Sequence, residues 1–287
     1  MKPPSFGYSR PESVAEALAV LASLGSDAKV LAGGQSLVPL LSMRLAAPAH
    51  LVDINRLAEL GYVRVAGGQV EVGALARHAQ LLADPAAAAA QPLLAKALRL
   101  VAHPAIRNRG TTVGSIVHAD PAAEMTAVLA LLGGSVRLAG TSGERAVPAS
   151  EFFLGPLESD VRSGELATEA TFPVLPAAAG CAFAEVSRRR GDYAVCGVAA
   201  VVQLDDDGGI SRATAAYLSV ASRPLVLDLT QAGGQLDVGA AARLAMARVD
   251  PESDIHATAD YRRHLAGVLT ERVLREAVAD ARERADV

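Results

Sequence analysis

The sequence predicts an α+β protein in which two mixed units are followed by a smaller third unit. Three observations support this fold class. Helical and strand-like patterns alternate around a glycine loop in the first 55 residues, a hairpin pattern follows at 62–75, and a long antiparallel hairpin at 193–220 precedes a helical tail. We place the boundaries of the units at residues 1–55, 56–176 and 177–287.

The first unit begins with a predicted helix over residues 9–25, which Ser9 or Ser13 can cap and Gly25 ends. A short apolar strand, KVL, then runs into the glycine loop AGGQS at 32–36. The pattern LVPLLSMRL predicts a second helix, and HLVDI at 50–54 predicts a second strand. The order is therefore helix, strand, glycine loop, helix and strand.

The second unit opens with a hairpin that turns at Gly67-Gly68. Its remaining predicted elements are helices at 74–83, 91–102 and 122–133, and strands at 135–139 and 166–172. Between the second and third of these helices lies the segment RNRGTTVGSIVHADP, at 107–121. The third unit begins after AAAG at 177–180, which predicts a linker, and its antiparallel hairpin turns at 205–209. Two helices, over 238–249 and 260–285, then pack on this sheet.

Composition and charge exclude several classes of protein. The net charge of −4 argues against a nucleic-acid binder, which normally has a basic face. No apolar run approaches the roughly 20 residues that a membrane span needs, and residues 1–13 contain no signal core, so we expect a cytoplasmic protein. Two cysteines, Cys181 and Cys196, are too few for a disulfide framework, a four-thiolate zinc site or an iron–sulfur cluster. We interpret both as packing residues.

The two glycine-bearing segments, AGGQS and GTTVGS, are candidate anion sites. Where a strand turns into a helix, glycines allow close backbone approach and free N–H groups point at a phosphate. The dinucleotide fingerprint is excluded because no two glycines here are two residues apart, and the P-loop is excluded because no Gly-Lys pair occurs. AGGQS alone is also compatible with a plain tight turn. Two such loops in different units could instead hold one pyrophosphate from both sides.

Four segments, in order along the chain, resemble one known family. They are KVLAGGQSLVPLLSMRLAAPAHLVDIN, IRNRGTTVGSIVHADPAAE, FAEVSRRRGDYAVCGVAAVV and YRRHLAGVLTERVL. Together they resemble the flavoprotein (medium) subunit of the molybdenum hydroxylases, the family of xanthine dehydrogenase and aerobic carbon monoxide dehydrogenase. The resemblance covers nearly the full chain and is strongest to the carbon monoxide dehydrogenase branch.

The resemblance implies a two-subdomain FAD-binding domain, of the vanillyl-alcohol-oxidase/PCMH-like type, followed by a small α+β domain with an antiparallel sheet and helices. It also implies that the FAD pyrophosphate lies between the two glycine loops. The corresponding residues of this chain are Ala32, Gly33, Gly34, Gln35 and Ser36 in the first loop, and Thr111, Thr112, Gly114 and Ser115 in the second.

Val113 departs from the family pattern, because the second loop of the family usually has two adjacent glycines. A β-branched residue does not readily take a positive φ. Either Val113 has an ordinary β conformation, or the loop is reshaped and binds FAD less tightly. We expect the β conformation, since Gly114 and Ser115 remain.

Further candidates around the flavin come from the same resemblance. It implies that Asp120 accepts hydrogen bonds from the FAD ribose, although Asp120 in HADP could equally cap a helix that starts at Pro121. Tyr193 is expected to flank the isoalloxazine ring, the alternative being a core anchor with a wet hydroxyl. Leu166 matches a family position near the flavin edge, although an apolar residue in a strand is more often part of the core. Lys29 is a further candidate because of its own position, on the flank of the first loop.

Two other clusters of polar residues are open to more than one interpretation. The run Arg188 to Arg190 is either a solvated turn or, through Arg189 or Asp192, a support for the loop beside the flavin. No metal site is predicted at His118, Asp120 and Glu124, because the segment lacks a third strong ligand at a known spacing.

No catalytic dyad or nucleophile motif is evident, so the expected chemistry belongs to the flavin. The resemblance implies an electron-transfer subunit that accepts electrons from [2Fe–2S] clusters on a small partner subunit and passes them to an external acceptor, a quinone or NAD. A large subunit would hold the molybdenum cofactor, and the complex would be a dimer of heterotrimers. Two alternatives stay open: a self-sufficient flavin oxidoreductase acting on a small substrate, and a non-enzymatic nucleotide-binding scaffold.

Overall fold

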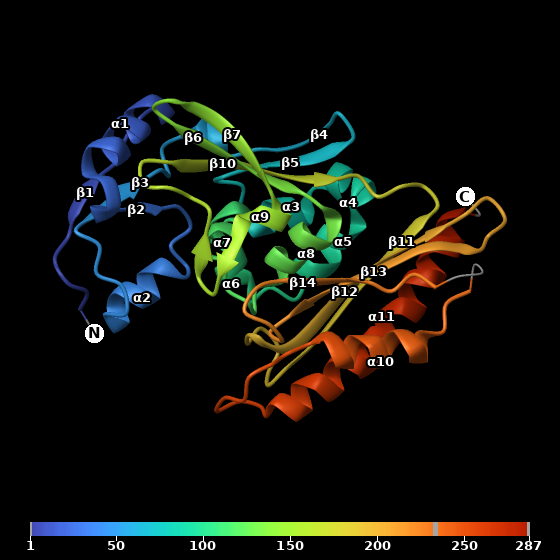
Figure 1. Cartoon of the computed structure of the whole chain (residues 1–287). Coiled ribbons are helices and arrows are strands. Elements are labelled where there is room, and N and C mark those ends of the chain that lie inside the picture. The colour runs from blue at the N-terminus through green and yellow to red at the C-terminus, as the bar shows by residue number, and fades with distance from the viewer. Residues whose placement is uncertain (1, 232–234, 286–287) are drawn as a thin grey trace.

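A computed structural model describes residues 2–231 and 235–285 of the chain. Mixed helices and strands form three larger sheets, as the predicted α+β class requires (Figure 1). The first sheet, in the order β1-β3-β2, is parallel. Its elements and the helices beside it are β1 (Gly7–Ser9), α1 (Val14–Leu24), β2 (Ala28–Leu31), α2 (Leu37–Met43) and β3 (His50–Asp53). Short 3-10 turns lie at Gly25–Asp27 and Ala58–Leu60.

The boundaries of α1 follow from its sequence. Ser13 caps the helix by accepting a hydrogen bond from the Glu16 N–H, at 3.2 Å. Gly25, with a φ of +59°, ends it. Of the two predicted caps, Ser13 is therefore the one that the structure uses.

The second sheet has five antiparallel strands in the order β4-β5-β10-β6-β7. The elements of this part of the chain are β4 (Val63–Ala66), β5 (Gln69–Gly73), α3 (His78–Ala83), α4 (Pro85–Ala90), α5 (Pro92–Leu98), α6 (Pro104–Arg107), α7 (Thr112–His118), α8 (Glu124–Leu132), β6 (Ser135–Gly140), β7 (Gly143–Pro148), α9 (Ala149–Phe152), β8 (Phe153–Gly155), β9 (Glu158–Ser159) and β10 (Leu166–Pro173). The predicted hairpin at Gly67-Gly68 is confirmed, since β4 pairs with β5.

The first two predicted helices of this part are shorter in the structure, and one helix was not predicted. The helix expected at 91–102 spans only Pro92–Leu98. The helix expected from residue 74 begins at His78, because residues 76–78 pair with the second glycine segment: the His78 N–H donates to the Gly110 carbonyl and the Thr112 N–H to the Ala76 carbonyl. The second glycine segment itself contains a separate helix, α7, which the pattern of small residues did not indicate.

The third sheet is antiparallel, in the order β11-β12-β13-β14. Its strands and helices are β11 (Ala179–Ser187), β12 (Ala194–Leu204), β13 (Ile210–Leu218), β14 (Leu225–Asp228), α10 (Val238–Arg248) and α11 (Ala259–Ala285). The predicted linker at 177–180 is wrong in its second half, because Ala179 and Gly180 already belong to β11. A β-carbon on Gly180 would lie 2.2 Å from the Ala277 carbonyl oxygen, so the glycine allows α11 to pack directly on the strand.

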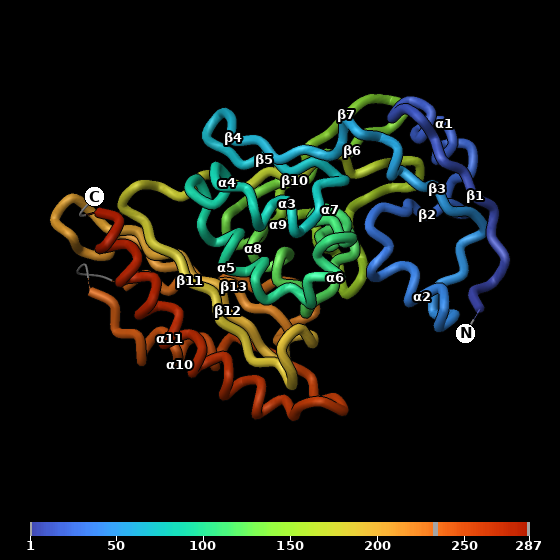
Figure 2. The backbone as a smooth tube through the Cα atoms, turned by 180° about the vertical axis from the view of Figure 1, so that it is seen from behind, coloured from blue at the N-terminus to red at the C-terminus, as the bar shows by residue number. Residues whose placement is uncertain are grey.

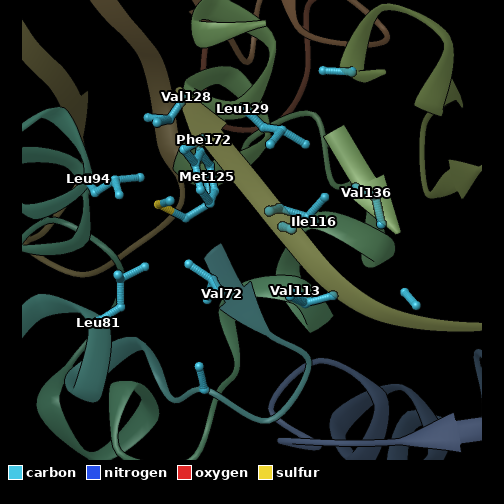
Figure 3. Packing of buried hydrophobic residues seen from close by; sticks show 14 of the residues in the cluster. Val72, Leu81, Leu94, Val113, Ile116, Met125, Val128, Leu129, Val136 and Phe172 are labelled. Atoms are coloured by element: carbon cyan, nitrogen blue, oxygen red, sulfur yellow. The ribbon is translucent and has the colours of Figure 1, made fainter. Parts of the chain in front are cut away.

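Two apolar cores support this arrangement. One joins the first two sheets, their helices and one face of the third sheet, and part of it surrounds β10, where Phe172 and Met125 lie among Val72, Leu94 and Ile116 (Figure 3). The other lies between the third sheet and the helices α10 and α11, which cover one of its faces. Cys181 and Cys196 are free and fully buried, one in each core, in agreement with a packing role.

The fold brings the two glycine loops together. Seen from either side, the connection between β2 and α2 lies beside α6 and α7 (Figures 1 and 2). The loop that follows β13 lies next to the same region, since the Ser219 N–H donates to the Pro121 carbonyl at 2.8 Å. Within the described residues, no helix combines the length and the apolar character that crossing a membrane requires.

Candidate cofactor site

A cavity of about 630 Å³ lies where the two glycine loops meet, within the roughly 300–1,000 Å³ of small-molecule and cofactor pockets. It is lined mainly by backbone and apolar groups, with a few charged side chains. Twelve of the thirteen predicted site residues line it: Lys29, Ala32, Gly33, Gly34, Gln35, Ser36, Thr111, Gly114, Ser115, Asp120, Leu166 and Tyr193. The structure therefore brings together residues that lie up to 164 positions apart in the sequence (193 minus 29).

The first loop lines this cavity with residues 32–36. Gly34 has a φ of +73°, which turns the chain into α2. The Gln35 side chain donates to the Gly33 carbonyl at 3.0 Å and fixes that carbonyl. Among the described residues, no acceptor pairs with the backbone N–H groups of residues 33–36. These four N–H groups can therefore bind an anion.

The two loops touch at Gly33. A β-carbon on this residue would lie 2.5 Å from the Arg109 carbonyl oxygen and 2.7 Å from the Gly110 α-carbon. Glycine is thus required here for contact between the loops, and not only for the approach of a ligand. The two adjacent glycines have different roles: Gly33 allows the contact between the two loops, and Gly34 makes the turn into α2.

The second loop ends in α7, whose N-cap is Thr111. The Thr111 Oγ1 accepts a hydrogen bond from the Gly114 N–H at 3.1 Å. Val113 is the second residue of this helix and is 1% exposed (Figure 3). The expected β conformation of Val113 is therefore wrong: its backbone is helical, a conformation that a β-branched residue adopts without a positive φ.

Thr112 is the one predicted site residue that does not line the cavity. It is fully buried, and its hydroxyl lies 3.2 Å from the Nδ1 of His78. Burial lowers the pKa of His78 to about 4, and the nearby Arg107 adds to this effect, so the imidazole is neutral at pH 7. His78 itself lines the cavity. Sequence reasoning missed it because its place depends on the long-range pairing of residues 76–78 with the second loop.

Asp120 lies at the end of α7, after Ala119, whose φ is +54°. Its Oδ1 accepts a hydrogen bond from the Ala122 N–H at 2.9 Å. The structure places the N-cap of α8 at Ala123, so Asp120 supports the turn before α8 but does not cap the helix. Asp120 also lines the cavity, and a ribose hydroxyl could use the remaining acceptor capacity of its carboxylate.

Charged groups gather around the Asp120 end of the cavity. Burial lowers the pKa of His118, against the opposing influence of Asp120, and Lys29 lowers it further. Burial, with the repulsion from Glu185, raises the pKa of Glu124 to about 8. Within the described part of the chain, no three His, Cys, Asp or Glu side chains are grouped closely enough to hold a metal ion.

Tyr193 stands at the edge of the cavity with 68% of its surface exposed, so it is not a core anchor. Its neighbour Asp192 also lines the cavity, and the Nε of Arg189 donates to the Asp192 carboxylate at 3.3 Å. Arg188 lies 3.6 Å from the same carboxylate. Arg188 and Arg189 thus pair with the loop that carries Tyr193 while their side chains stay largely exposed, so both interpretations of this run remain compatible with the structure.

Leu166 is 2% exposed and contributes to both the core and the cavity wall, so its two interpretations are compatible. Other wall residues were not predicted, among them Ile106, Val161 and Ala167. They are apolar residues in ordinary patterns, and nothing in their sequence context separates a cavity wall from a core position.

The chain matches known proteins over nearly its whole length. Residues 4–175 match the family described as "FAD binding domain in molybdopterin dehydrogenase", and residues 181–277 match the "CO dehydrogenase flavoprotein C-terminal domain". The 6-hydroxypseudooxynicotine dehydrogenase complex subunit alpha of Paenarthrobacter nicotinovorans is 42% identical, over 98% of this chain and 97% of the relative. The carbon monoxide dehydrogenase medium chain of Hydrogenophaga pseudoflava is 39% identical, over 97% and 99%.

A solved structure shows the same architecture. Carbon monoxide dehydrogenase from Hydrogenophaga pseudoflava, in a form that lacks the Mo-pyranopterin moiety of the molybdenum cofactor, contains a chain that superposes with a TM-score of 0.93. The two chains are 38% identical, and the match covers 98% of this chain and 99% of the other.

The residues present fit FAD. The four unpaired N–H groups of the first loop suit a pyrophosphate, the two loops meet closely enough to approach it together, and Asp120 offers an acceptor for a ribose hydroxyl. The fold, with an FAD-binding domain followed by a C-terminal domain, is the one expected. The chain belongs to the FAD-binding medium subunits of the molybdenum hydroxylase family of oxidoreductases.

Proposed function

We propose that this chain is the electron-transfer flavoprotein of a molybdenum hydroxylase complex. It would accept electrons from [2Fe–2S] clusters of a small partner subunit and deliver them to an external acceptor, a quinone or NAD. The observation that carries this proposal is the meeting of the two glycine loops at one cavity with unpaired backbone donors. When bound, FAD would supply the redox chemistry, because an isoalloxazine ring can take electrons singly, as a [2Fe–2S] cluster delivers them, and give up a pair to a quinone or NAD.

The residues of the chain hold and shield this cofactor. We assign the pyrophosphate to the N–H groups of residues 33–36 and the start of α7, and a ribose hydroxyl to Asp120. Tyr193, exposed at the cavity edge and braced through Asp192, would flank the isoalloxazine ring. Lys29 and Leu166 would contact the cofactor from β2 and β10.

The small number of cysteines indicates that the chain needs partner subunits. The chain has two cysteines, both buried in strands, so it cannot ligate a [2Fe–2S] cluster through cysteine itself. Electrons from such a cluster must therefore come from another chain. The relatives described above are named as a complex subunit and a medium chain, which supports assembly with other chains. We propose that these are a large molybdenum-cofactor subunit and a small [2Fe–2S] subunit, in a dimer of heterotrimers.

Two finer assignments complete the proposal. We propose a carbon monoxide dehydrogenase-like complex, in which the large subunit would select carbon monoxide, an aldehyde or an N-heterocycle. We also propose the division of this chain into two FAD-binding subdomains, residues 1–55 and 56–176, and a C-terminal domain, residues 177–287. The matched family segments, 4–175 and 181–277, support the position of the second boundary.

Anaerobic reduction of the flavin tests the proposal. The purified chain loaded with FAD is mixed with carbon monoxide, with aldehydes and with N-heterocycles, and the visible flavin absorbance is followed. We expect no bleaching by these substrates when the chain is alone, and bleaching when the same chain is assembled with its two partner subunits. Rapid bleaching of the isolated chain by one of them would contradict the proposal and favour a self-sufficient oxidoreductase.

A further inference from the structure

Behind the two glycine loops lies a chain of hydrogen bonds that the cavity does not expose. The Nη1 of Arg77 donates to the Arg109 carbonyl at 2.7 Å, and its Nη2 donates to the Oδ1 of Asn55 at 2.7 Å. The Nδ2 of Asn55 in turn donates to the Ala32 carbonyl at 2.9 Å. Three bonds thus join the carbonyl just before Gly33 to the carbonyl just before Gly110.

Asn55 is held in the one amide orientation that satisfies both sides. Its backbone N–H and its Nδ2 donate to the Oδ1 of Asp53, at 2.9 and 2.6 Å. Arg77 can only donate and ionised Asp53 can only accept, so the amide oxygen must face Arg77 and the amide nitrogen Asp53. Burial opposes ionisation of Asp53, but hydrogen bonds from Tyr8 and Asn55 outweigh it and lower the pKa of this carboxyl.

Arg77 is fixed from its backbone as well as from its side chain. It pairs with Thr111 in an isolated antiparallel bridge, so its main chain runs along the second loop while its guanidinium reaches the first. Burial lowers the pKa of Arg77, and Arg109 adds to this, but arginine stays charged in proteins. This half-buried positive charge lies directly behind two loops that present N–H groups to an anion.

We propose that Asn55 and Arg77 are positioning residues of the FAD site, although neither lines the cavity. They hold the two loops at the separation that a shared pyrophosphate requires, and Arg77 adds positive potential there. The loops touch through Gly33 without a side chain between them, and the hydrogen-bonded chain from Ala32 through Asn55 and Arg77 to Arg109 holds them in that contact.

The test uses the full-length chain stripped of flavin, with FAD affinity measured by flavin fluorescence and apoprotein stability by thermal unfolding. The variants are Asn55→Ala, Arg77→Met and the double variant. Arg64→Met is the matched control, because Arg64 pairs with Glu71 at 2.9 Å and stacks on Tyr62 but lies outside the cavity wall. Each single variant should raise the FAD Kd about tenfold or more, since each breaks a hydrogen bond that involves a charged group.

The double variant separates positioning from general stability. If the two residues act through one chain of bonds, the double variant should lose no more FAD affinity than the weaker-binding single variant. The proposal is overturned if the Kd of both single variants stays within about twofold of the parent, if the losses add in the double variant, or if Arg64→Met loses FAD to the same extent.

A second substitution of Arg77 keeps the test possible if the first variant does not fold. Should Arg77→Met not fold, Arg77→Lys replaces it, since lysine keeps the charge but cannot span both acceptors. We then expect a Kd about threefold or more above the parent, with the apoprotein unfolding temperature of the control. An unchanged Kd in Arg77→Lys would equally overturn the proposal.

Discussion

Gly33 and Gly110 pack backbone against backbone: a β-carbon on Gly33 would lie 2.7 Å from the Gly110 α-carbon. This contact joins the two loops that form the FAD cavity, one on the parallel sheet and one at the start of α7. It makes the geometry of each loop depend on the other.

Gly33→Ala should therefore loosen the site without unfolding the protein. The new methyl group must push the second loop away, because the nearest atoms are backbone atoms that cannot rotate aside. We expect at least a tenfold loss of FAD affinity, equivalent to about 1.4 kcal/mol or more. Flavin fluorescence measures it. Gly140→Ala is the control, since its β-carbon would meet its nearest atom at an ordinary 3.6 Å, and equal losses in both variants would contradict the prediction.

Val113→Gly restores the second glycine that the family usually carries, and we expect no gain in FAD affinity. Val113 is helical and 1% exposed, so the substitution removes core packing and puts a glycine in a helix. The free energy of unfolding should fall by roughly 2–4 kcal/mol. Chemical denaturation of the apoprotein measures the loss. Tighter FAD binding in the variant would show instead that Val113 weakens the site.

Acid should release FAD as His78 takes up a proton. The pKa of His78 is lowered to about 4 by burial, whereas the unfolded chain protonates it near 6.5. The unfolded state thus binds more protons between these values, so this group makes stability fall as the pH drops from 6.5 to 4. The free flavin fluorescence should rise over that range. His78→Gln keeps a neutral polar group beside Thr112 and should release FAD at a lower pH; an unchanged release curve would exclude His78.

Glu124 and Glu185 should make the free energy of unfolding fall as the pH rises, which is the opposite of the effect of His78. Burial, together with the repulsion from Glu185, raises the pKa of Glu124 to about 8. Burial also raises the pKa of Glu185 to about 7. The Oε2 of Glu185 is buried and has no hydrogen-bond partner among the described residues. The folded state binds more protons above 4.5, so stability is highest below 4.5 and falls as the pH rises to about 8.

Glu185→Gln tests this pair. The variant should raise the free energy of unfolding at pH 8 by on the order of 1–2 kcal/mol and change it little at pH 5. Urea denaturation at the two pH values measures the difference. Glu151→Gln, at an exposed position, should have no such pH dependence. A Glu185→Gln variant that is less stable than the parent at pH 8 would contradict the account of the pair.

Asp120→Ala should weaken FAD binding more than it weakens folding. Its carboxylate supports one turn through the Ala122 N–H but does not cap α8, so the folding loss should stay near 1 kcal/mol. FAD titration and apoprotein denaturation of the same variant give the two losses. Equal losses in both would assign Asp120 to the turn alone.

Local patterns in the sequence were enough to predict most of the fold. Helical spacing with a serine cap placed α1, alternation around Gly67-Gly68 placed the first hairpin, and the long apolar runs on either side of the 205–209 turn placed β12 and β13. The helix α7 was not predictable in this way. Threonine, valine, glycine and serine are poor helix formers, and α7 begins where it does because Thr111 caps it and pairs with Arg77.

The candidate site was predictable where its residues lie in the glycine motifs, and not where it depends on contacts between distant segments. Both loops reach one cavity, as expected, but Thr112 turns inward to His78, a residue 34 positions away. Glu124 and Glu185 come from α8 and β11, and Asn55 and Arg77 meet only because two loops lie side by side. A sequence pattern cannot show pairs that only tertiary packing creates.

The central claim, that the two loops hold FAD at one cavity, is tested most directly by the cofactor content of the purified full-length chain. Its visible absorbance spectrum is recorded, the cofactor released by denaturation is identified by chromatography, and flavin-stripped protein is titrated with FAD beside Gly33→Ala. We predict flavin bands, released FAD, and saturable binding of one FAD per chain that Gly33→Ala weakens. A colourless chain that still binds no FAD in the titration would contradict the claim.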